Sequence, residues 1–113
     1  MGYVKHHAIV VTSWNDEVIE FALVEARRCG LAVCLVASEC EGYHSVFVAP
    51  DGSKEGWAES DDGDKRRGAF KGWMRAQQYE DGGSSLEWVE VAYGNDDHDA
   101  IVTDHQWKDK GAT

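Results

Sequence analysis

The order of the predicted elements favours an α+β fold: strand, helix, strand, strand, helix, strand, and then one more strand. Runs of β-branched and aromatic residues alternate with two segments in which apolar residues recur at helical spacing. Glycines such as Gly30 and Gly42 separate these runs. The chain of 113 residues has the size of one domain. We expect residues 1–105 to form that domain and residues 106–113 to be a flexible C-terminal tail.

The first half of the chain predicts three strands and one helix. Residues 5–13 have strand composition, and Ser13 or Asn15 can cap the helix that follows. That helix ends with two arginines in its last turn, and Gly30 suits the left-handed position after it. Residues 31–37 and 43–49 predict the second and third strands.

The second half predicts a long loop, a helix and two strands. The loop covers residues 51–63 and is longer than most connections. The helix is predicted from about Asp62 to Gln78, and its last turns place Phe70, Trp73, Met74 and Gln77 on one face. Residues 86–93 and 100–105 predict the last two strands.

These elements predict a ferredoxin-like βαββαβ sandwich with an extra C-terminal hairpin strand. Two split βαβ units place both helices on one face of an antiparallel sheet, and the usual strand order is 4-1-3-2. The other face is expected to be apolar too, because the first strand has apolar residues on both sides, Val10 on one and Val11 on the other, and the fourth strand likewise has Val89 on one side and Trp88 on the other. We therefore expect a homodimer or higher homo-oligomer that covers this apolar face.

The overall composition excludes several classes of protein. A net charge of −10 and an isoelectric point near 4.7 disfavour non-specific binding to nucleic acid. No apolar run approaches the ~20 residues needed to span a bilayer, and the N-terminal apolar run is interpreted as a strand and not a signal peptide. We therefore expect a cytoplasmic protein without membrane association. The spacing of the three cysteines fits no disulfide or metal framework, and Cys29 and Cys34 are expected to be buried thiols.

The strongest candidate binding surface combines basic residues with one tryptophan. Trp57 can offer a stacking surface, and the nearby cations are Lys54, Arg67, Lys71 and Arg75. This surface suits either a partner protein or a small anionic, nucleotide-like ligand bound by a homo-oligomer. Ion pairing along the helix surface is the simpler interpretation, and Asp64 before Arg67 favours it. No phosphate-binding glycine motif is present, and we expect no cofactor.

A metal site is a weaker hypothesis. His6, Asp51 and His98 fall at the same end of the predicted sheet, where imidazole and carboxylate groups can hold a transition metal. His7 cannot join His6, because adjacent strand residues point to opposite faces. A solvated acidic turn near two histidines explains the same pattern. A metal-assisted hydrolase is therefore the least favoured function, and we do not expect an enzyme.

The segment from Gly42 to Asp97 contains the stretches DGSKEGWAES, GDKRRGAF and EWVEVAYG. In these stretches it resembles small uncharacterised proteins found in bacteriophage genomes. The resemblance covers about half of the chain. It implies an accessory phage or prophage product in the host cytoplasm, and such proteins are often small oligomers that bind or inhibit a host factor. No mechanism and no functional residue follow from it.

Overall fold

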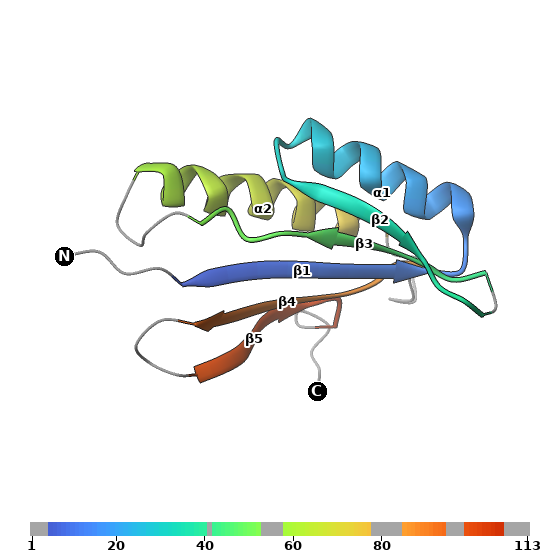
Figure 1. Ribbon diagram of the computed structural model, residues 1–113. Coiled ribbons are helices and arrows are strands. Elements are labelled where there is room, and N and C mark those ends of the chain that lie inside the picture. The colour runs from blue at the N-terminus through green and yellow to red at the C-terminus, as the bar shows by residue number, and fades with distance from the viewer. Residues whose placement is uncertain (1–4, 41, 53–57, 78–84, 95–98, 108–113) are drawn as a thin grey trace.

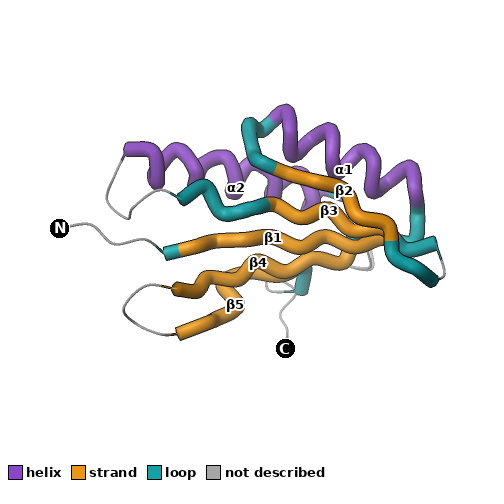
Figure 2. The backbone as a smooth tube through the Cα atoms, in the orientation of Figure 1, coloured by secondary structure: helices purple, strands orange, loops and turns teal. Residues whose placement is uncertain are grey.

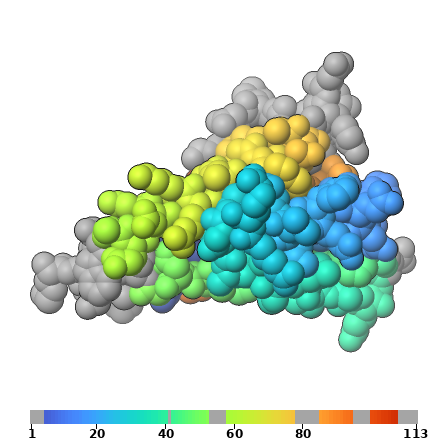
Figure 3. Space-filling view, turned by 90° about the horizontal axis from the view of Figure 1, so that it is seen from above, coloured from blue at the N-terminus to red at the C-terminus, as the bar shows by residue number. Residues whose placement is uncertain are grey.

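The computed structural model describes residues 5–40, 42–52, 58–77, 85–94 and 99–107. It has two helices and a five-stranded antiparallel sheet, which confirms the predicted α+β class. Both helices lie on one side of the sheet (Figures 1 and 2), where α1 packs beside α2 (Figure 3). The elements in chain order are β1 (His6–Ser13), α1 (Asp16–Arg28), β2 (Val33–Ala37), β3 (His44–Val48), α2 (Ala58–Ala76), β4 (Glu87–Gly94) and β5 (Asp99–His105).

The sheet has β1 at its centre and the strand order β2-β3-β1-β4-β5. Ile9 on β1 lies opposite Val48 on β3 and Glu90 on β4, so these three side chains share one face. At one edge β5 pairs with β4, with a register shift between Glu90 and Val91. Such a bulge increases the local twist of the strand. The other edge is β2, which pairs with β3.

The ends of α1 follow the predicted capping signals. The side-chain oxygen of Asn15 accepts hydrogen bonds from the backbone N–H groups of Glu17 and Val18, at 3.1 and 3.2 Å. These bonds satisfy donors that have no partner within the helix. After the helix, Gly30 adopts φ 85°, the left-handed conformation that a glycine tolerates best.

Helix α2 begins at Ala58, four residues before the predicted start at Asp62. The predicted loop of residues 51–63 is therefore too long, and part of it, residues 53–57, lies outside the described residues. The first turn carries Glu59 and Asp61. Carboxylates near the N-terminus of a helix are stabilised by the helix dipole, so a polar, acidic segment that looks like a loop can begin a helix.

The core lies between the sheet and the two helices. Its fully buried members come from every layer: Ile9, Val11, Ile19, Ala22, Ala26, Val46, Val48, Phe70, Met74 and Leu86, with Trp88 nearly so. Gln106, the first residue of the predicted tail, is also buried, and its side-chain oxygen accepts a 2.8 Å hydrogen bond from the backbone N–H of Trp88. The folded part thus includes Gln106, whereas residues 108–113 lie outside the described residues.

Within the ranges that the structure describes, neither helix combines the length and the apolar character needed to cross a membrane.

Candidate interaction surface

The face of the sheet that points away from both helices carries a continuous set of apolar side chains. The strand register places Phe47, Val10 and Val89 in one row across β3, β1 and β4. The row continues to Cys34 on β2, and a neighbouring row pairs Val91 with Val102 on β5. We call this surface the open face, and its apolar members are Val10, Cys34, Val36, Phe47, Val89, Val91, Tyr93 and Val102.

Much of the open face is exposed to solvent. Val10, Phe47 and Tyr93 are each 37–39% exposed, although Val10 belongs to the central strand. An aromatic side chain has roughly 150–250 Å² of surface that burial can remove from water. At the exposed fractions of Phe47, Tyr93 and the half-exposed Trp107, the three side chains together leave about 200–300 Å² of apolar surface in contact with water. The exposed valines enlarge this area. Monomeric proteins rarely expose a contiguous apolar patch larger than a few hundred Å².

The open face is nearly free of charge. Among the paired residues that the structure describes on this face, Glu87 is the one carboxylate. It lies in the row of Thr12 and Ser45, beside the apolar row of Val10. The whole chain carries a net charge of −10. Two copies can therefore bring these faces together without placing like charges at the centre of the contact.

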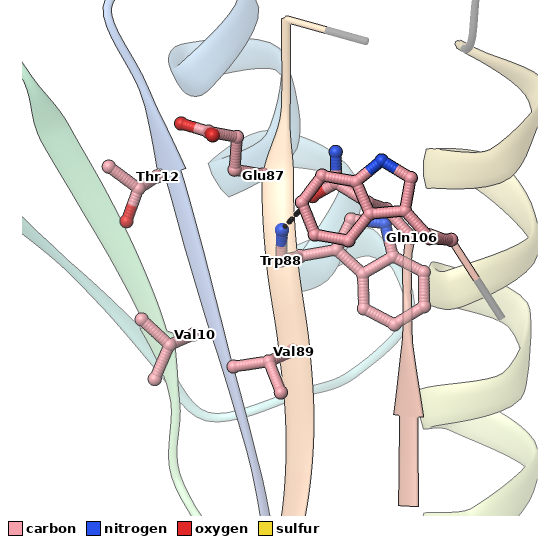
Figure 4. A pocket seen from close by; sticks show the side chains of 7 residues that line it. Val10, Thr12, Glu87, Trp88, Val89 and Gln106 are labelled. Carbon is pink, nitrogen blue, oxygen red and sulfur yellow. Dashed lines mark hydrogen bonds between the residues drawn. The ribbon is translucent and has the colours of Figure 1, made fainter. Parts of the chain in front are cut away.

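A shallow hollow of about 400 Å³ extends the open face towards the end of β5. Its lining includes Val10, Thr12 and Val89 of the open face, together with Trp107. Figure 4 shows these lining residues and the hydrogen bond from the backbone of Trp88 to Gln106. This hollow gives the apolar surface relief, which a flat sheet lacks, and an opposing side chain can insert there.

Cys34 is an exposed residue of the open face, so the expectation that it is a buried thiol is wrong. Cys29 is half-buried, and burial is the main cause that raises the pKa of its thiol. The apolar run of residues 31–37 predicts a strand correctly. The apolar run alone does not show that this strand lies at the edge of the sheet. It also does not show that every second side chain points to the open face.

The predicted basic stripe of Arg67, Lys71 and Arg75 does not form an exposed surface. It faces the sheet and pairs with two carboxylates that point up from it, Glu90 on β4 and Asp104 on β5. Both carboxylate side chains are at most 10% exposed. The interpretation as ion pairing is therefore the correct one, but the partners lie mainly on other elements.

The ion pairs form an alternating chain of charges, which we call the charge ladder. Arg67 pairs with Asp64 and lies 3.5 Å from Glu90, measured from Nε to Oε2. Lys71 Nζ bridges Glu90 Oε1 at 2.9 Å and Asp104 Oδ2 at 3.1 Å. Arg75 closes the ladder with an Nη2 to Asp104 Oδ1 distance of 2.5 Å, and its guanidinium lies 5.1 Å from the ring centroid of Trp88.

The geometry of a helix explains why the stripe is buried at one end. Each step of four residues turns about 40° beyond a full turn, so a stripe at this spacing winds slowly around the helix. The side chains of Arg67, Lys71 and Arg75 are accordingly 7, 17 and 29% exposed. Only the end at Arg75 approaches the surface. A stripe that is identified from spacing alone has no known orientation towards the sheet.

At the start of the ladder, the carboxylate of Asp51 approaches helix α2 closely beside Gly63, which has no side chain. A Cβ atom at this position would collide with the carboxylate of Asp51, whose Oδ2 lies 3.8 Å from Arg67 Nη1. Lys54 and Trp57, the other members of the predicted binding surface, lie outside the described residues. The described part of the predicted surface is thus an internal charge ladder.

The residues of the weak metal hypothesis are engaged elsewhere or lie outside the described part. The ring of His6 lies 5.3 Å from that of Tyr93, and Asp51 lies near Arg67. His98 is not among the described residues. Across the described ranges, no three His, Cys, Asp or Glu side chains gather into a group that could hold a metal ion.

Glu90 and Asp104 are the ion-pair partners that sequence reasoning does not identify. Each is a carboxylate within a strand, and its side chain lies on the helix side of the sheet, where it pairs with cations of α2. A buried carboxylate needs a cation, and the helix supplies three cations at the matching spacing. In the sequence, an acidic residue in the middle of a predicted strand is therefore the feature that could have indicated the ladder.

The ladder predicts a specific acid dependence of stability. Burial acts to raise the pKa of Asp104, but hydrogen bonds from Arg75 and Lys71 outweigh it and hold this pKa below its ordinary value. Asp104 therefore stabilises the fold at neutral pH, and this contribution is lost as pH falls from the ordinary value of about 3.9 through the lower folded-state pKa. We expect Asp104→Asn to reduce stability at neutral pH and to flatten its acid dependence in that range.

The measurement is the free energy of unfolding as a function of pH for the wild type, Asp104→Asn and the control Asp62→Asn, which changes an exposed carboxylate. The control should follow the wild type. Parallel curves for Asp104→Asn and the wild type would show that the ladder does not stabilise the ionised form.

No family model, no curated protein and no solved structure matches this chain.

Proposed function

We propose that this protein is a small acidic interaction protein that self-associates through the open face of its sheet. The observation that carries the proposal is an exposed, nearly uncharged apolar surface on the sheet of a strongly acidic chain. A symmetric dimer uses the same patch on both copies, so the patch must not repel itself. The distribution of charge on the open face meets this requirement.

The biological role that we propose is that of an accessory phage protein that engages a host protein in the host cytoplasm. The resemblance of residues 42–97 to small bacteriophage proteins supports this role. We further propose that the fold is of the ferredoxin-like type. In support, β4, β1, β3 and β2 are neighbours in that order, and β5 is added beside β4.

A small anionic ligand, the alternative that the sequence favours next, has weaker support. The described cations that were expected to hold it already pair with carboxylates of the same chain. A ligand would have to displace Glu90 or Asp104, both buried, and leave a carboxylate without its cation. A metal-assisted hydrolase has the least support, since its described residues form no ligand group.

The test of self-association is the solution mass of the unmodified chain. We expect light scattering at tens of micromolar to give twice the chain mass of 12.5 kDa or a higher multiple, and dilution to reduce it. Burial of apolar surface supplies the driving force. A mass of one chain throughout this range would refute the proposal that the open face is a self-association surface.

A further inference from the structure

Strand β2 forms one edge of the described sheet, and its outer row of backbone groups pairs with no described strand. It pairs with β3, and no other described strand lies beside it (Figure 1). Four of its five residues are exposed. An edge strand of this kind is a template on which another extended segment can add.

The hydrogen bonds that flank β2 identify the unpaired groups. The backbone N–H of Ala49 donates to the carbonyl of Ala32, and the N–H of Ser38 donates to the carbonyl of Tyr43, both at 2.9 Å. Hydrogen-bonded pairs alternate along an antiparallel ladder, so Cys34 and Val36 also direct their backbone groups to β3. The N–H and C=O groups of Val33, Leu35 and Ala37 therefore point outward.

Strand β2, with the sequence VCLVA, lacks the charged residues and the proline that protect many edge strands. The opposite edge, β5, differs, because it carries the register shift next to Glu90 and contains Asp104. Bulges and charges are the usual means by which proteins prevent pairing at an edge. The two edges of this sheet are thus unequal, and β2 is the open one.

A hollow beside β2 can receive a side chain of an added strand. It measures about 290 Å³, lies where β2 begins, and its lining includes Cys34, Phe47 and Ala49. In strand addition, backbone hydrogen bonds supply affinity and pockets for alternate side chains supply specificity. The hollow adjoins the edge and is lined by apolar residues, so it suits an apolar side chain at one alternate position.

We infer that the edge of β2 binds an extended peptide segment of a partner protein, with apolar side chains at alternate positions and a basic residue at the end that lies beside Glu39. The basic residue follows from the net charge of −10 and from exposed Glu39 after the strand. This inference rests on the proposed interaction function and names the kind of partner. It uses a different surface from the one proposed for self-association.

The decisive variant is Leu35→Pro, with Leu35→Ala as its matched control. The N–H of Leu35 points outward, so proline removes a donor for the partner without removing a hydrogen bond to β3. The alanine variant truncates the same side chain and keeps the N–H. A melting curve for each variant shows that it is folded before binding is measured.

The probe is a displayed library of random short peptides, selected on the immobilised wild-type protein. We expect enriched peptides with apolar residues at alternate positions. They should bind wild type and Leu35→Ala, but bind Leu35→Pro at least about tenfold more weakly. A selection that enriches no peptide overturns the inference, as do peptides that bind Leu35→Pro and Leu35→Ala equally well.

A second copy of the chain is the other candidate occupant of this edge. If Leu35→Pro halves the solution mass while Leu35→Ala does not, the edge binds a second copy and the inference is overturned. The two proposals fail separately. If the protein is monomeric and its peptide binding depends on the N–H of Leu35, the proposal of self-association fails and the proposal of the edge site stands. If the protein is a dimer that selects no peptide, the edge site fails and self-association stands.

Discussion

We expect the replacement of Arg67 with alanine to lower the free energy of unfolding by up to about 3–5 kcal/mol, the range measured when one partner of a buried ion pair is removed. Arg67 is the most buried cation of the charge ladder, and its partner Glu90 is 6% exposed. Without Arg67, Glu90 keeps Lys71 and the hydroxyl of Thr103 as partners. The loss is a large fraction of the 5–15 kcal/mol that holds a typical domain folded.

Denaturant unfolding followed by far-ultraviolet circular dichroism measures this loss, and Arg66→Ala is the matched control. Arg66 is the preceding residue and carries the same charge, but it is exposed. Exposed substitutions usually change stability by less than about 0.5 kcal/mol. If both variants lose the same stability, net charge and not the ladder explains the effect.

A double substitution separates a buried charge from lost packing. Arg67→Met together with Glu90→Leu removes both charges and keeps apolar volume. Replacing a buried ion pair with apolar residues is often neutral or stabilising, so we expect the double variant to be more stable than Arg67→Ala. If the double variant is less stable than Arg67→Ala, the ion pair itself contributes to stability. The loss in Arg67→Ala would then not come only from leaving Glu90 without this cation.

The elements that sequence analysis predicts best are those with local signals. The strand composition of residues 5–13 and the cap at Asn15 both predict what the structure has, because they depend on neighbours along the chain. The added strand after β4 follows from a hairpin, which is also local. The predicted start of α2 is too late because acidic, glycine-containing sequence is common to loops and to first helical turns.

The candidate site was harder to predict because it depends on how elements face one another. Arg67 and Lys71 stand out as cations, but Glu90 and Asp104 join them only when α2 packs over β4 and β5. Spacing along a helix fixes which residues share a stripe, and it leaves open whether the stripe faces water or the sheet. The apolar open face was predictable because each strand residue points to one of two faces.

The open face can be disrupted by one charge at its centre. Val10 lies on the central strand, between Phe47 and Val89. In the symmetric dimer that we propose, Val10→Lys places two unpaired ammonium groups in the contact. A buried, unpaired charge costs several kcal/mol, so we expect the dissociation constant of the dimer to rise by at least about a hundredfold.

The control for this variant is Val24→Lys on α1. Val24 is 60% exposed, lies on the other side of the molecule from the open face, and its substitution changes the net charge equally. Lysine also opposes the acidic charge of the chain, so a loss of association cannot come from added repulsion between acidic copies. Melting temperatures close to that of the wild type would show that both variants fold.

Sedimentation equilibrium of the wild type, Val10→Lys and Val24→Lys over a range of concentrations is the most direct test of self-association through the open face. The account predicts that wild type and Val24→Lys share one dissociation constant and that Val10→Lys sediments as a single chain at tens of micromolar. Equal association of Val10→Lys and Val24→Lys would contradict it, because the contact would then lie elsewhere on the molecule.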